Sequence, residues 1–558
     1  MIEAIKQKIK FLLEQNFSIG SIVVEEPKRG NADLAVPLFA YAKVLNHTLP
    51  EIGMLFKLVI EENLSEIQSC EFTSGFLNIY LVRERLSTII LKEVFEKKQN
   101  YGSQTLASHE TVVMDYSSPN IAKSFSVGHL RSTVIGNALH KIYAKLGYQV
   151  VAVNHLGDWG TQFGKMIVAY HKWGNKDEIK SNPIAELQKL YLKFHEEEKN
   201  DPTLEQQARD TFRLLELNDP ESIALWEWFK EVSLKEFMEM YDLLNVSFDY
   251  YTGESFYNDK MDAVVLELEQ KGLLKEDDGA TIVDLGSDMP PALIKRSDGA
   301  TLYMTRDLAA LLYRHTEYHA NKVLYIVGNE QQLHFKQLKL ISDLMGYHFE
   351  VEHVNFGLVL IDGKKMSTRS GKFKRLEDVI DQAILDAKEA INQKNPDLKN
   401  ADLVAKAVGV GAIIFNDLKN ERHLDIEFNL ENMLKFEGQT GPYLQYSSVR
   451  IESMLRGQHL DINLVDFNYF NQDHYFEMVK LIQQFPNIIL KAKELNAPNQ
   501  IAKYIILLAQ GFNSFYAKQR VIVEEVSHLH ANLLLISCVQ TIINEGLRLL
   551  GIQSLKEM

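Results

Sequence analysis

Short apolar runs and helical periodicity alternate through the middle of this chain. Several runs rich in Val, Ile and Leu have the length and composition of buried strands. These runs lie at 111–115, 149–153, 322–327 and 356–361. Between them, apolar residues recur at helical spacing from 127 to 146 and over 331–341. Strands that alternate with helices predict a parallel sheet covered on both faces, so we expect an α/β fold.

The pattern changes on either side of this central region. Residues 1–100 open at helical spacing and end in a strand-like run over 70–81, which predicts a small α+β domain. A largely helical stretch at about 175–275 predicts an insertion into the central region, and the chain is helix-rich after 376. We therefore expect an N-terminal domain at 1–100, a sheet domain at 105–375, a helical junction at 376–434 and an all-α domain at 435–558.

The composition is that of a globular protein with several domains. The chain has 558 residues, of which 46% are hydrophobic and 24% are charged. We find no apolar run long enough to span a bilayer and no signal-peptide pattern, so we expect a cytoplasmic protein without a membrane partner. The two cysteines, Cys70 and Cys538, are far apart in the sequence, which argues against a disulfide framework and a thiolate zinc site.

The balance of charge limits how the chain could hold a nucleic acid. The formal net charge is −15, which argues against binding through a strong overall positive field. Residues 361–375 depart from this balance, with six basic residues and one acidic residue. By charge alone, a solvated loop is the simpler interpretation of this run. A nucleic-acid partner would have to be gripped by local patches of this kind.

A loop rich in small residues joins the first predicted strand to the helix that follows. It runs from Ser117 to Ser126, and Gly128 and His129 stand at the mouth of the helix. Backbone N–H groups and the helix dipole favour a phosphate at such a position. A Gly-His pair alone occurs by chance, so its place after a strand is what indicates nucleotide chemistry.

The same segment resembles the signature of class I aminoacyl-tRNA synthetases, and specifically the arginyl-tRNA synthetases. Residues 126–129 stand where that family has its HIGH-type motif, with serine in place of the first histidine, and 118–120 and 130–133 match its flanks. Residues 365–367 resemble the family's KMSKS-type loop, with Thr368 in place of the second lysine. The likeness covers nearly the whole chain in domain order. It implies a Rossmann-type catalytic domain with a helical insertion and an all-α anticodon-binding domain.

The resemblance implies that ATP activates arginine, which is then transferred to tRNA(Arg) with release of AMP and pyrophosphate. Because the arginine carboxylate would attack the α-phosphate in line, catalysis would depend on positioning and charge neutralisation. The expected catalytic residues are His129, Gly128, Lys365 and Lys123. The expected ATP-binding residues are Ser126, Gly128, His129, Lys365, Met366, Ser367 and Arg369. Mg²⁺ is expected with ATP, and no zinc.

Recognition of arginine requires groups that suit a planar cation. Tyr303 and Asp307 lie four residues apart, so on a helix both would project to one face. A carboxylate there can accept two parallel N–H bonds from a guanidinium group. The resemblance extends the set of arginine-binding residues to Ser118, Pro119, Asn120, His129, Tyr303, Asp307, Gln331 and Asp115. The segment after the second strand also resembles a family motif, and we expect its His155 and Gln162 to line the site.

Two further segments resemble tRNA-binding parts of the family. Residues 30–37 are similar to its N-terminal additional domain. Residues 437–451 resemble the start of a DALR-type anticodon-binding domain, where aromatic and basic side chains could stack on and pair with unpaired bases. The expected contacts are Tyr443, Gln445, Tyr446 and Arg450. Core packing of the two tyrosines is the alternative interpretation.

Three other functions share parts of this pattern. Another class I synthetase would have the same nucleotide motifs, although the cysteinyl type is disfavoured because zinc-ligand cysteines are missing. A small nucleotidylyltransferase shares the Gly-His element but leaves both ends of the chain unexplained. A non-enzymatic tRNA-binding relative would usually have lost residues such as His129 and Lys365. We expect the partners arginine, ATP and tRNA, and a monomer.

Overall fold

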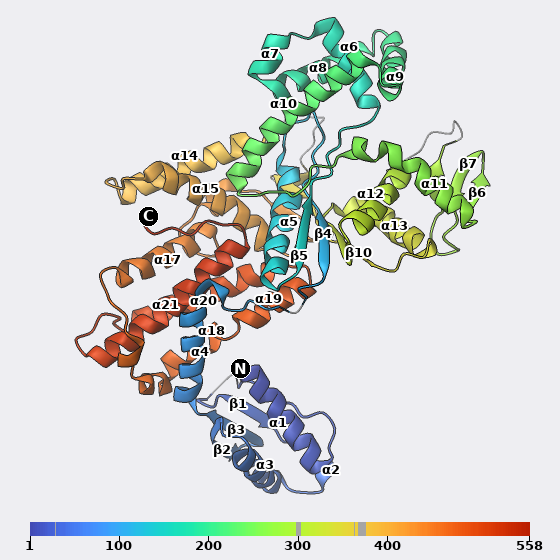
Figure 1. Ribbon diagram of the computed structural model, residues 1–558. Coiled ribbons are helices and arrows are strands. Elements are labelled where there is room, and N and C mark those ends of the chain that lie inside the picture. Colours follow the sequence, from blue (N-terminus) through green and yellow to red (C-terminus); the bar gives the residue numbers. More distant parts are fainter. Residues whose placement is uncertain (28–29, 106, 297–302, 362, 366–374) are drawn as a thin grey trace.

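The computed structural model describes residues 1–558 apart from 28–29, 106, 297–302, 362 and 366–374. A small parallel sheet lies at the centre, with a helical insertion on one side, a small N-terminal domain on the opposite side, and a large helical bundle alongside (Figure 1). The carboxyl ends of parallel strands meet at one edge of their sheet, so this arrangement fixes where ligands can collect.

The central sheet has four parallel strands in the order β10-β9-β4-β5. Their bounds are β4 Thr111–Asp115, β5 Gln149–Val153, β9 Lys322–Tyr325 and β10 Glu350–His353. Helix α5 (Val127–Lys145) connects β4 to β5. Gly136 allows α5 to pack closely, because a Cβ there would lie 2.2 Å from the ring of Tyr116. The expected α/β fold with a parallel sheet is confirmed.

The strand expected at 356–361 is in a different sheet from the one predicted. Strand β11 (Val359–Ile361) pairs with β12 (Lys364–Lys365) and with β13 (Ile426–Glu427). The fourth central strand is instead β10, which has only one apolar residue, Val351. Strand β10 lies at an edge of the sheet and none of its residues is fully buried, so it needs no continuous apolar run.

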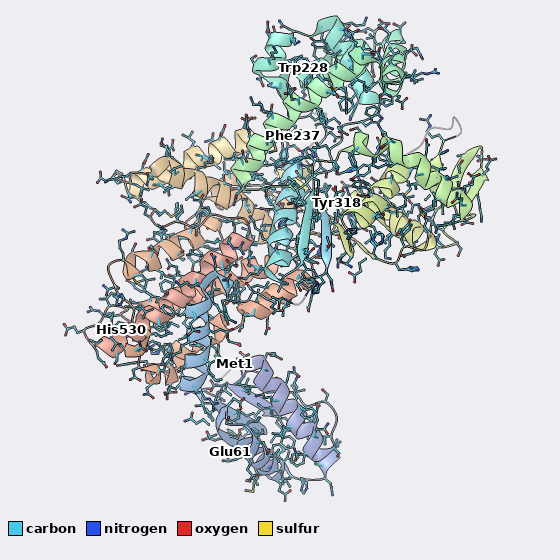
Figure 2. All side chains as sticks on the ribbon, viewed as in Figure 1. Met1, Glu61, Trp228, Phe237, Tyr318 and His530 are labelled. Atoms are coloured by element: carbon cyan, nitrogen blue, oxygen red, sulfur yellow. The ribbon has the colours of Figure 1, made fainter. Side chains whose placement is uncertain are left out.

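The insertion and the second half of the sheet domain are mainly helical. The insertion contains α6 Thr161–Trp173, α7 Lys176–Ser181, α8 Pro183–Glu197, α9 Thr203–Glu216 and α10 Pro220–Leu244. After it come α11 Met261–Gln270, the antiparallel strands β6 Leu274–Asp277, β7 Ala280–Val283 and β8 Ala292–Lys295, then α12 Tyr303–Glu317 and α13 Gln332–Leu344. Helix α10 leads from the insertion, where Trp228 lies, back to Phe237 beside the sheet domain (Figure 2). Both Phe229 and Phe237 on this helix are fully buried.

The N-terminal domain is α+β, as expected, but its last strand is a hairpin. It contains α1 Ile2–Phe17, α2 Ala42–Leu45, α3 Leu49–Asn63, β1 Leu34–Pro37, β2 Ile67–Thr73 and β3 Phe76–Leu81. The single strand predicted over 70–81 is wrong, because the chain turns between β2 and β3 at Ser74 and Gly75, whose φ angles are 50° and 87°. Glycine adopts a positive φ without strain, which permits the turn.

Helices make up the rest of the chain. They are α4 Arg83–Lys97, α14 Leu376–Lys394, α15 Ala401–Leu418, α16 Leu430–Met433, α17 Gly441–Leu455, α18 Asp473–Ile482, α19 Phe485–Glu494, α20 Asn499–Lys518 and α21 Val526–Leu549. Contrary to our expectation, α21 is long and apolar enough to cross a membrane by length and composition. However, 61% of its most apolar window is buried inside the protein, and α21 packs against α4, α17 and α20. It is the core helix of the bundle.

Two buried ion pairs join helix α5 to this bundle. Near its N-terminal end, Arg131 contacts Asp417 of α15 at 3.1 Å and also donates hydrogen bonds of 2.8 Å to the carbonyls of Gly357 and Leu424. At its C-terminal end, Lys145 contacts Glu545 of α21 at 2.8 Å. All four charged side chains are at most 3% exposed. Helix α5 is therefore held at both ends by charges that water does not screen.

We expect Asp417→Ala to lower stability by about 3–5 kcal/mol, because it leaves the buried guanidinium of Arg131 without its counter-charge. Burial raises the pKa of Asp417 even with Arg131 beside it, which shows that the ion pair itself is not strongly favourable. The loss of stability in the variant therefore comes from the buried positive charge that Arg131 is left with. The urea midpoint measures the effect. Asp402→Ala is the control, because Asp402 pairs with Lys388 at an exposed site and should shift the midpoint little. Equal midpoints for both variants would contradict this prediction.

Candidate active-site cleft

A cavity of about 570 Å³ opens at the carboxyl ends of β4 and β9. Its walls come from the loop after β4, the start of α5, the segment after β5, and helices α12 and α13. Nine of the predicted site residues line it: Asp115, Ser118, Asn120, Gly128, His129, His155, Tyr303, Asp307 and Gln331. The fold therefore brings residues from three distant parts of the sequence into one space.

The loop after β4 turns sharply into the cavity. Ser117, Ser118 and Ala122 all have positive φ angles, of 72°, 47° and 61°. Hydrogen bonds hold this backbone in place: the Ser117 N–H donates to Ser132 Oγ at 2.8 Å, and Ser118 Oγ donates to Asp115 at 2.9 Å. Non-glycine residues at positive φ are strained, and such strain is typical of functional loops.

A close approach of two backbone segments fixes Asn120 in the cleft. A Cβ on Gly157 would lie 2.3 Å from Asn120 Oδ1 and 3.3 Å from its Cα, so any side chain at 157 would displace that of Asn120. The Gly157 N–H donates to the carbonyl of Pro119 at 3.1 Å. Pro119 was predicted to contact arginine, but it is not among the residues that line the cavity. The structure gives it a role in joining the two loops.

Ser126 and His129 form a capping box at the start of α5. The Ser126 N–H donates to His129 Nδ1 at 3.0 Å, so Nδ1 carries no proton and the neutral ring is protonated on Nε2. Burial, with the nearby positive charge of Lys123, lowers the pKa of His129 to about 4. His129 is thus a neutral hydrogen-bond donor at the mouth of a helix. Ser126 was predicted to bind ATP, but its hydroxyl caps the helix and it does not line the cavity.

The basic segment is held at both of its described ends. Lys365 lies in β12, where its backbone pairs with Leu360 of β11. At the other end, Arg375 forms a β-bridge with Ser126, and the Leu376 N–H donates to the carbonyl of Phe125 at 3.0 Å. The chain therefore returns directly beside the start of α5. Met366, Ser367 and Arg369, which were predicted to bind ATP, lie outside the described residues.

Lys123 is close to the start of α5 but does not line the cavity. Its Nζ lies 6.0 Å from the ring centre of Tyr191 in the insertion, and burial lowers its pKa. Gln162 does not line the cavity either, because it lies in the first turn of α6, which leads away into the insertion. These two predicted residues are thus placed near the cleft without facing it.

The opposite wall of the cleft is acidic. Asp307 Oδ2 accepts a hydrogen bond of 2.6 Å from His334 Nε2. Burial alone would raise the pKa of Asp307, but the hydrogen bond and charge of His334 outweigh it, so the pKa lies below its ordinary value. Asp307 is therefore ionised at neutral pH.

Asp115 differs from Asp307 because its charge is already compensated. Arg314 of α12, whose side chain is fully buried, contacts Asp115 at 2.7 Å, and Ser118 donates to the other carboxylate oxygen. Asp115 was predicted to add a second carboxylate for the substrate. The structure instead gives it the role of anchoring Arg314 and the loop after β4.

Glu254 is a cleft residue that the sequence did not reveal. It lies in a short 3-10 helix (Glu254–Lys260) after the insertion, and its N–H donates to the carbonyl of Leu156 at 2.9 Å. Burial raises the pKa of Glu254 to about 7, although Arg306 lies 3.5 Å away. No local motif marks this residue. A β-bridge between Val153 and Tyr250 brings its segment to the cleft.

The predicted tRNA contacts lie on α17, far along the chain from this cleft. Tyr446 is 45% exposed, and Arg450 lies 4.2 Å from the ring centre of Tyr516. Gln445 is fully buried and donates to the carbonyls of Ala407 and Gln553, so the structure gives it a packing role instead of the predicted contact. The Tyr443 hydroxyl accepts a hydrogen bond from the side chain of Asn513 at 2.8 Å.

Among the described residues, no group of three or more His, Cys, Asp and Glu side chains is arranged to hold a metal ion. Cys70 and Cys538 are both buried as free thiols, and burial raises the pKa of each. A resident metal therefore has no evident cage in the part of the chain described here.

Comparison with known families divides the chain into three matched parts. Residues 90–430 match the model described as tRNA synthetases class I (R), catalytic domain, and 444–558 match the DALR anticodon binding domain. Residues 1–81 match the arginyl tRNA synthetase N terminal domain. These matches follow the same order as the domains in the structure.

Individual proteins show the same similarity over their full length. The arginine–tRNA ligase of an Exiguobacterium species is 48% identical, with 96% of this chain and 95% of the relative covered. The arginine–tRNA ligase of Enterococcus faecalis is 46% identical, with 100% of this chain and 99% of the relative covered. Among solved structures, the arginyl-tRNA synthetase of Plasmodium falciparum has a TM-score of 0.81 at 26% identity over 100% of this chain and 99% of its own. The Thermus thermophilus enzyme has a TM-score of 0.82 at 23% identity with both chains fully covered, which shows a shared fold.

We expect His129 to stay neutral from pH 5.5 to 8, with its proton on Nε2. The physical reason is that its pKa is lowered to about 4 and its Nδ1 already accepts the Ser126 N–H. Nitrogen-15 chemical shifts of histidine-labelled protein report both the tautomer and the titration. A midpoint for His129 near 6.5 would contradict the assignment.

Proposed function

The chain belongs to the arginyl-tRNA synthetase family, and we propose from this premise how its cleft divides the work of arginine–tRNA ligation. The protein is an arginine–tRNA ligase of class I, which joins L-arginine to tRNA(Arg) at the expense of ATP. The observation that supports our assignment of roles is that His129 and Asp307 line one cavity. Hydrogen-bond donors for a phosphate and an acidic pocket thus lie in the same cavity, within reach of a single small substrate.

The start of α5 supports the proposal for the phosphate end of this cavity. The Nε2–H of His129 is free to donate to phosphate oxygens, since Nδ1 is occupied. Gly128, which has no side chain, lets a phosphate approach the backbone N–H groups at the helix N-terminus. In-line attack by the arginine carboxylate forms a bond to the α-phosphorus and expels pyrophosphate, so these donors would stabilise charge that develops on the phosphates.

The basic segment that begins at Lys365 is the second source of positive charge. The pairing of Arg375 with Ser126 supports its placement over the phosphate end of the cleft. We assign Lys365 to the pyrophosphate that leaves, in keeping with a point charge that can follow a moving group. Mg²⁺ would arrive with ATP, coordinated mainly by phosphate oxygens, because magnesium usually keeps substrate and water ligands.

The acidic wall supports recognition of the guanidinium group. Asp307 is ionised and has a second oxygen that no described donor fills. Glu254 offers a further carboxylate, and a bound cation would favour its ionised form. Tyr303 and Gln331, both exposed at the cavity mouth, would close over the substrate. Lysine has a compact charge that cannot form two parallel hydrogen bonds, so this wall favours arginine.

The remaining parts of the chain would serve tRNA. We assign the exposed Tyr446, with Arg450 stacked on Tyr516, to contact with unpaired anticodon bases. The N-terminal domain, at about 1–100, would contact another part of the tRNA, and we propose that the enzyme acts as a monomer in the cytoplasm. Supplying each labelled amino acid in turn with ATP and total tRNA tests the whole assignment. Arginine should be the amino acid that becomes attached, and attachment of a different one would overturn it.

We expect His129→Ala to lower kcat for arginylation by about 10²–10³, because it removes one donor aimed at the phosphates. Steady-state arginylation at saturating tRNA measures the effect. His171→Ala is a matched control, since His171 is exposed and lies away from the cleft. A decrease of less than tenfold for His129→Ala would show that the ring does not act on the phosphates.

We expect Asp307→Asn to raise the KM for arginine at least about thirtyfold and to leave the KM for ATP nearly unchanged. Removing one partner of a buried charge pair costs about 2–5 kcal/mol of binding free energy. Because Asp307 would pair with the guanidinium group, this loss should appear in the KM for arginine. Asp343→Asn on α13 is the control, because Asp343 pairs with Lys339 and does not line the cleft. An unaltered arginine KM in Asp307→Asn would exclude the proposed role.

We expect the KM for arginine to fall as the pH rises from 6 to 8. Since the pKa of Glu254 is raised to about 7, its carboxylate becomes ionised over this range and its attraction for the guanidinium grows. Initial rates at a series of pH values measure the change. Glu254→Gln should make the arginine KM both higher and insensitive to pH. If that variant kept the pH dependence of the parent enzyme, another group would have to be responsible.

A further inference from the structure

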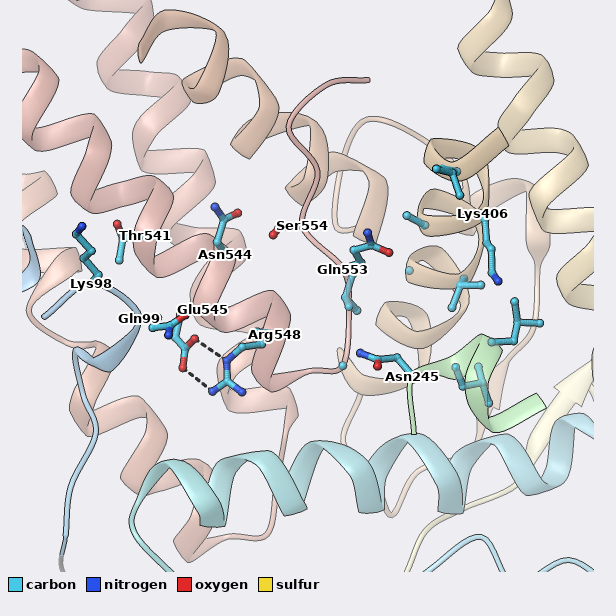
Figure 3. Close-up of a pocket in the computed structure, with 18 of the residues that line it drawn as sticks. Lys98, Gln99, Asn245, Lys406, Thr541, Asn544, Glu545, Arg548, Gln553 and Ser554 are labelled. Atoms are coloured by element: carbon cyan, nitrogen blue, oxygen red, sulfur yellow. Dashed lines mark hydrogen bonds and ion pairs between the residues drawn. The ribbon is translucent and has the colours of Figure 1, made fainter. Parts of the chain in front are cut away.

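Two adjoining cavities lie where the C-terminal half of helix α5 meets α21. The larger, of about 890 Å³, is bounded by α15, α21, the end of α10 and the C-terminal residues (Figure 3). The second, of about 540 Å³, is bounded by α5, α21 and the segment after α4. Gln99, Glu545 and Arg548 line both. We call the two together the junction trough; it lies between the catalytic helix α5 and the C-terminal bundle.

Positive charge exceeds negative charge in the junction trough. Its described lining contains five lysine and arginine side chains and two carboxylates. The cations are Lys98, Lys141, Lys145, Lys406 and Arg548, and the acids are Asp242 and Glu545. The chain as a whole has a formal net charge of −15. An excess of three positive charges is therefore a local feature that the overall composition opposes.

The buried floor of the trough already has more cations than anions. Glu545 accepts two hydrogen bonds from Arg548, at 2.7 and 2.8 Å, and contacts Lys145 at 2.8 Å. One carboxylate thus faces two cations, and the Glu545–Arg548 contact is visible in Figure 3. Burial, followed by the charge of Arg548, lowers the pKa of the neighbouring Lys141 to about 8. An anion here would relieve repulsion between groups that the fold forces together.

The rim of the trough has lysines without carboxylate partners. Within the described chain, Lys98, Lys141 and Lys406 make no ion pair with Asp or Glu. Lys98 and Lys406 project from opposite sides of the larger cavity (Figure 3). The second cavity is also lined by His140, whose buried Nδ1 has no hydrogen-bond partner among the described residues. Amide side chains of Gln99, Asn245, Asn544 and Gln553 complete the polar wall.

We propose that the junction trough binds the sugar–phosphate backbone of tRNA. Separate cations from α5, α15, α21 and the segment after α4 suit a polyanion with phosphates at intervals, whereas a free nucleotide concentrates its charge at one end. Amide side chains and His140 can bond ribose hydroxyls, which distinguish RNA. The proposal takes the identity of the RNA from the tRNA-ligase activity.

The position of the trough agrees with a substrate that reaches two domains. Lys141 follows His129 by twelve residues on the same helix, a distance of about 18 Å at 1.5 Å per residue. The opposite wall is α21, the core helix of the domain matched to anticodon binding. An RNA held by both the catalytic cleft and the C-terminal domain has to span this region. The trough would therefore fix the tRNA body between its two recognition ends.

The test compares the full-length enzyme with the triple variant Lys98→Gln, Lys141→Gln, Lys406→Gln. In the described parts of the chain these side chains make no ion pair with a carboxylate, so the substitutions should not unfold the protein. We expect the KM for tRNA to rise about tenfold, while kcat at saturating tRNA and the KM for arginine stay unchanged. The slope of log affinity for tRNA against log salt concentration should become shallower by up to about three.

A matched control removes the same charge elsewhere. Lys271→Gln, Lys275→Gln, Lys339→Gln alters three lysines near the β6–β7 hairpin and α13, on the far side of the sheet domain (Figure 1). Its tRNA KM and salt slope should match those of the parent. Phosphate ethylation interference then locates the contact on the tRNA. With the triple variant of the junction trough, ethylation of a few neighbouring phosphates should no longer interfere with binding. With the control variant, the interference pattern should match that of the parent.

Two results would overturn the proposal. An unchanged tRNA KM and salt slope in the junction variant would show that RNA does not occupy the trough. A lower kcat or a higher arginine KM at saturating tRNA would show that the lysines act through the fold of the catalytic domain instead. Either result leaves the ligase assignment intact, because the parent enzyme measured alongside still attaches arginine. A parent enzyme that attaches no arginine would count against the ligase assignment itself.

Discussion

Much of this structure depends on how Arg131 is held. Its guanidinium contacts Asp417 of the C-terminal helices, with both side chains buried, and donates to the carbonyls of Gly357 and Leu424. One side chain thereby joins the helix that presents His129, the segment that leads to Lys365, and the start of the bundle that would face tRNA. Because the ion pair with Asp417 is buried, small shifts of α5 relative to its neighbours would be energetically costly. The cleft is consequently built on a rigid element, as precise placement of phosphates requires.

Burial disfavours the charged forms of the side chains at both ends of the cleft, but its outcome differs between the two ends. At the phosphate end it keeps His129 neutral, and the Ser126 N–H directs the remaining proton to the outward nitrogen. At the acidic end, His334 keeps Asp307 ionised against the effect of burial, while at Glu254 the effect of burial outweighs that of Arg306, 3.5 Å away. The cleft therefore pairs a neutral donor with a negative wall, which suits a substrate whose carboxylate must attack a phosphate while its side chain carries a positive charge.

Much of the fold and part of the site were predictable from the sequence. Central strands such as β4 show a continuous apolar run because they are buried on both faces, and α5 shows helical spacing. The edge strand β10 was missed because one apolar residue is enough for its position. Within the site, Asp307 was recognisable from the family resemblance together with its spacing to Tyr303, whereas Glu254 has no motif and reaches the cleft through a pairing about a hundred residues away in sequence. The compensation of Asp115 by Arg314 was equally invisible, because the two residues meet across different elements.

By itself, the sequence determined which chemical groups are present and which local structures they favour: the capping residues before α5, the periodicity of the helices, and the order of the domains. These depend on interactions between residues that are close along the chain, so a linear pattern records them. Tertiary structure alone decided which carboxylates remain available, which side chains face the cleft, and where unpaired lysines gather beside α21. Those outcomes depend on burial and on charges brought together from distant segments, and their electrostatic effect arises only once water has been excluded.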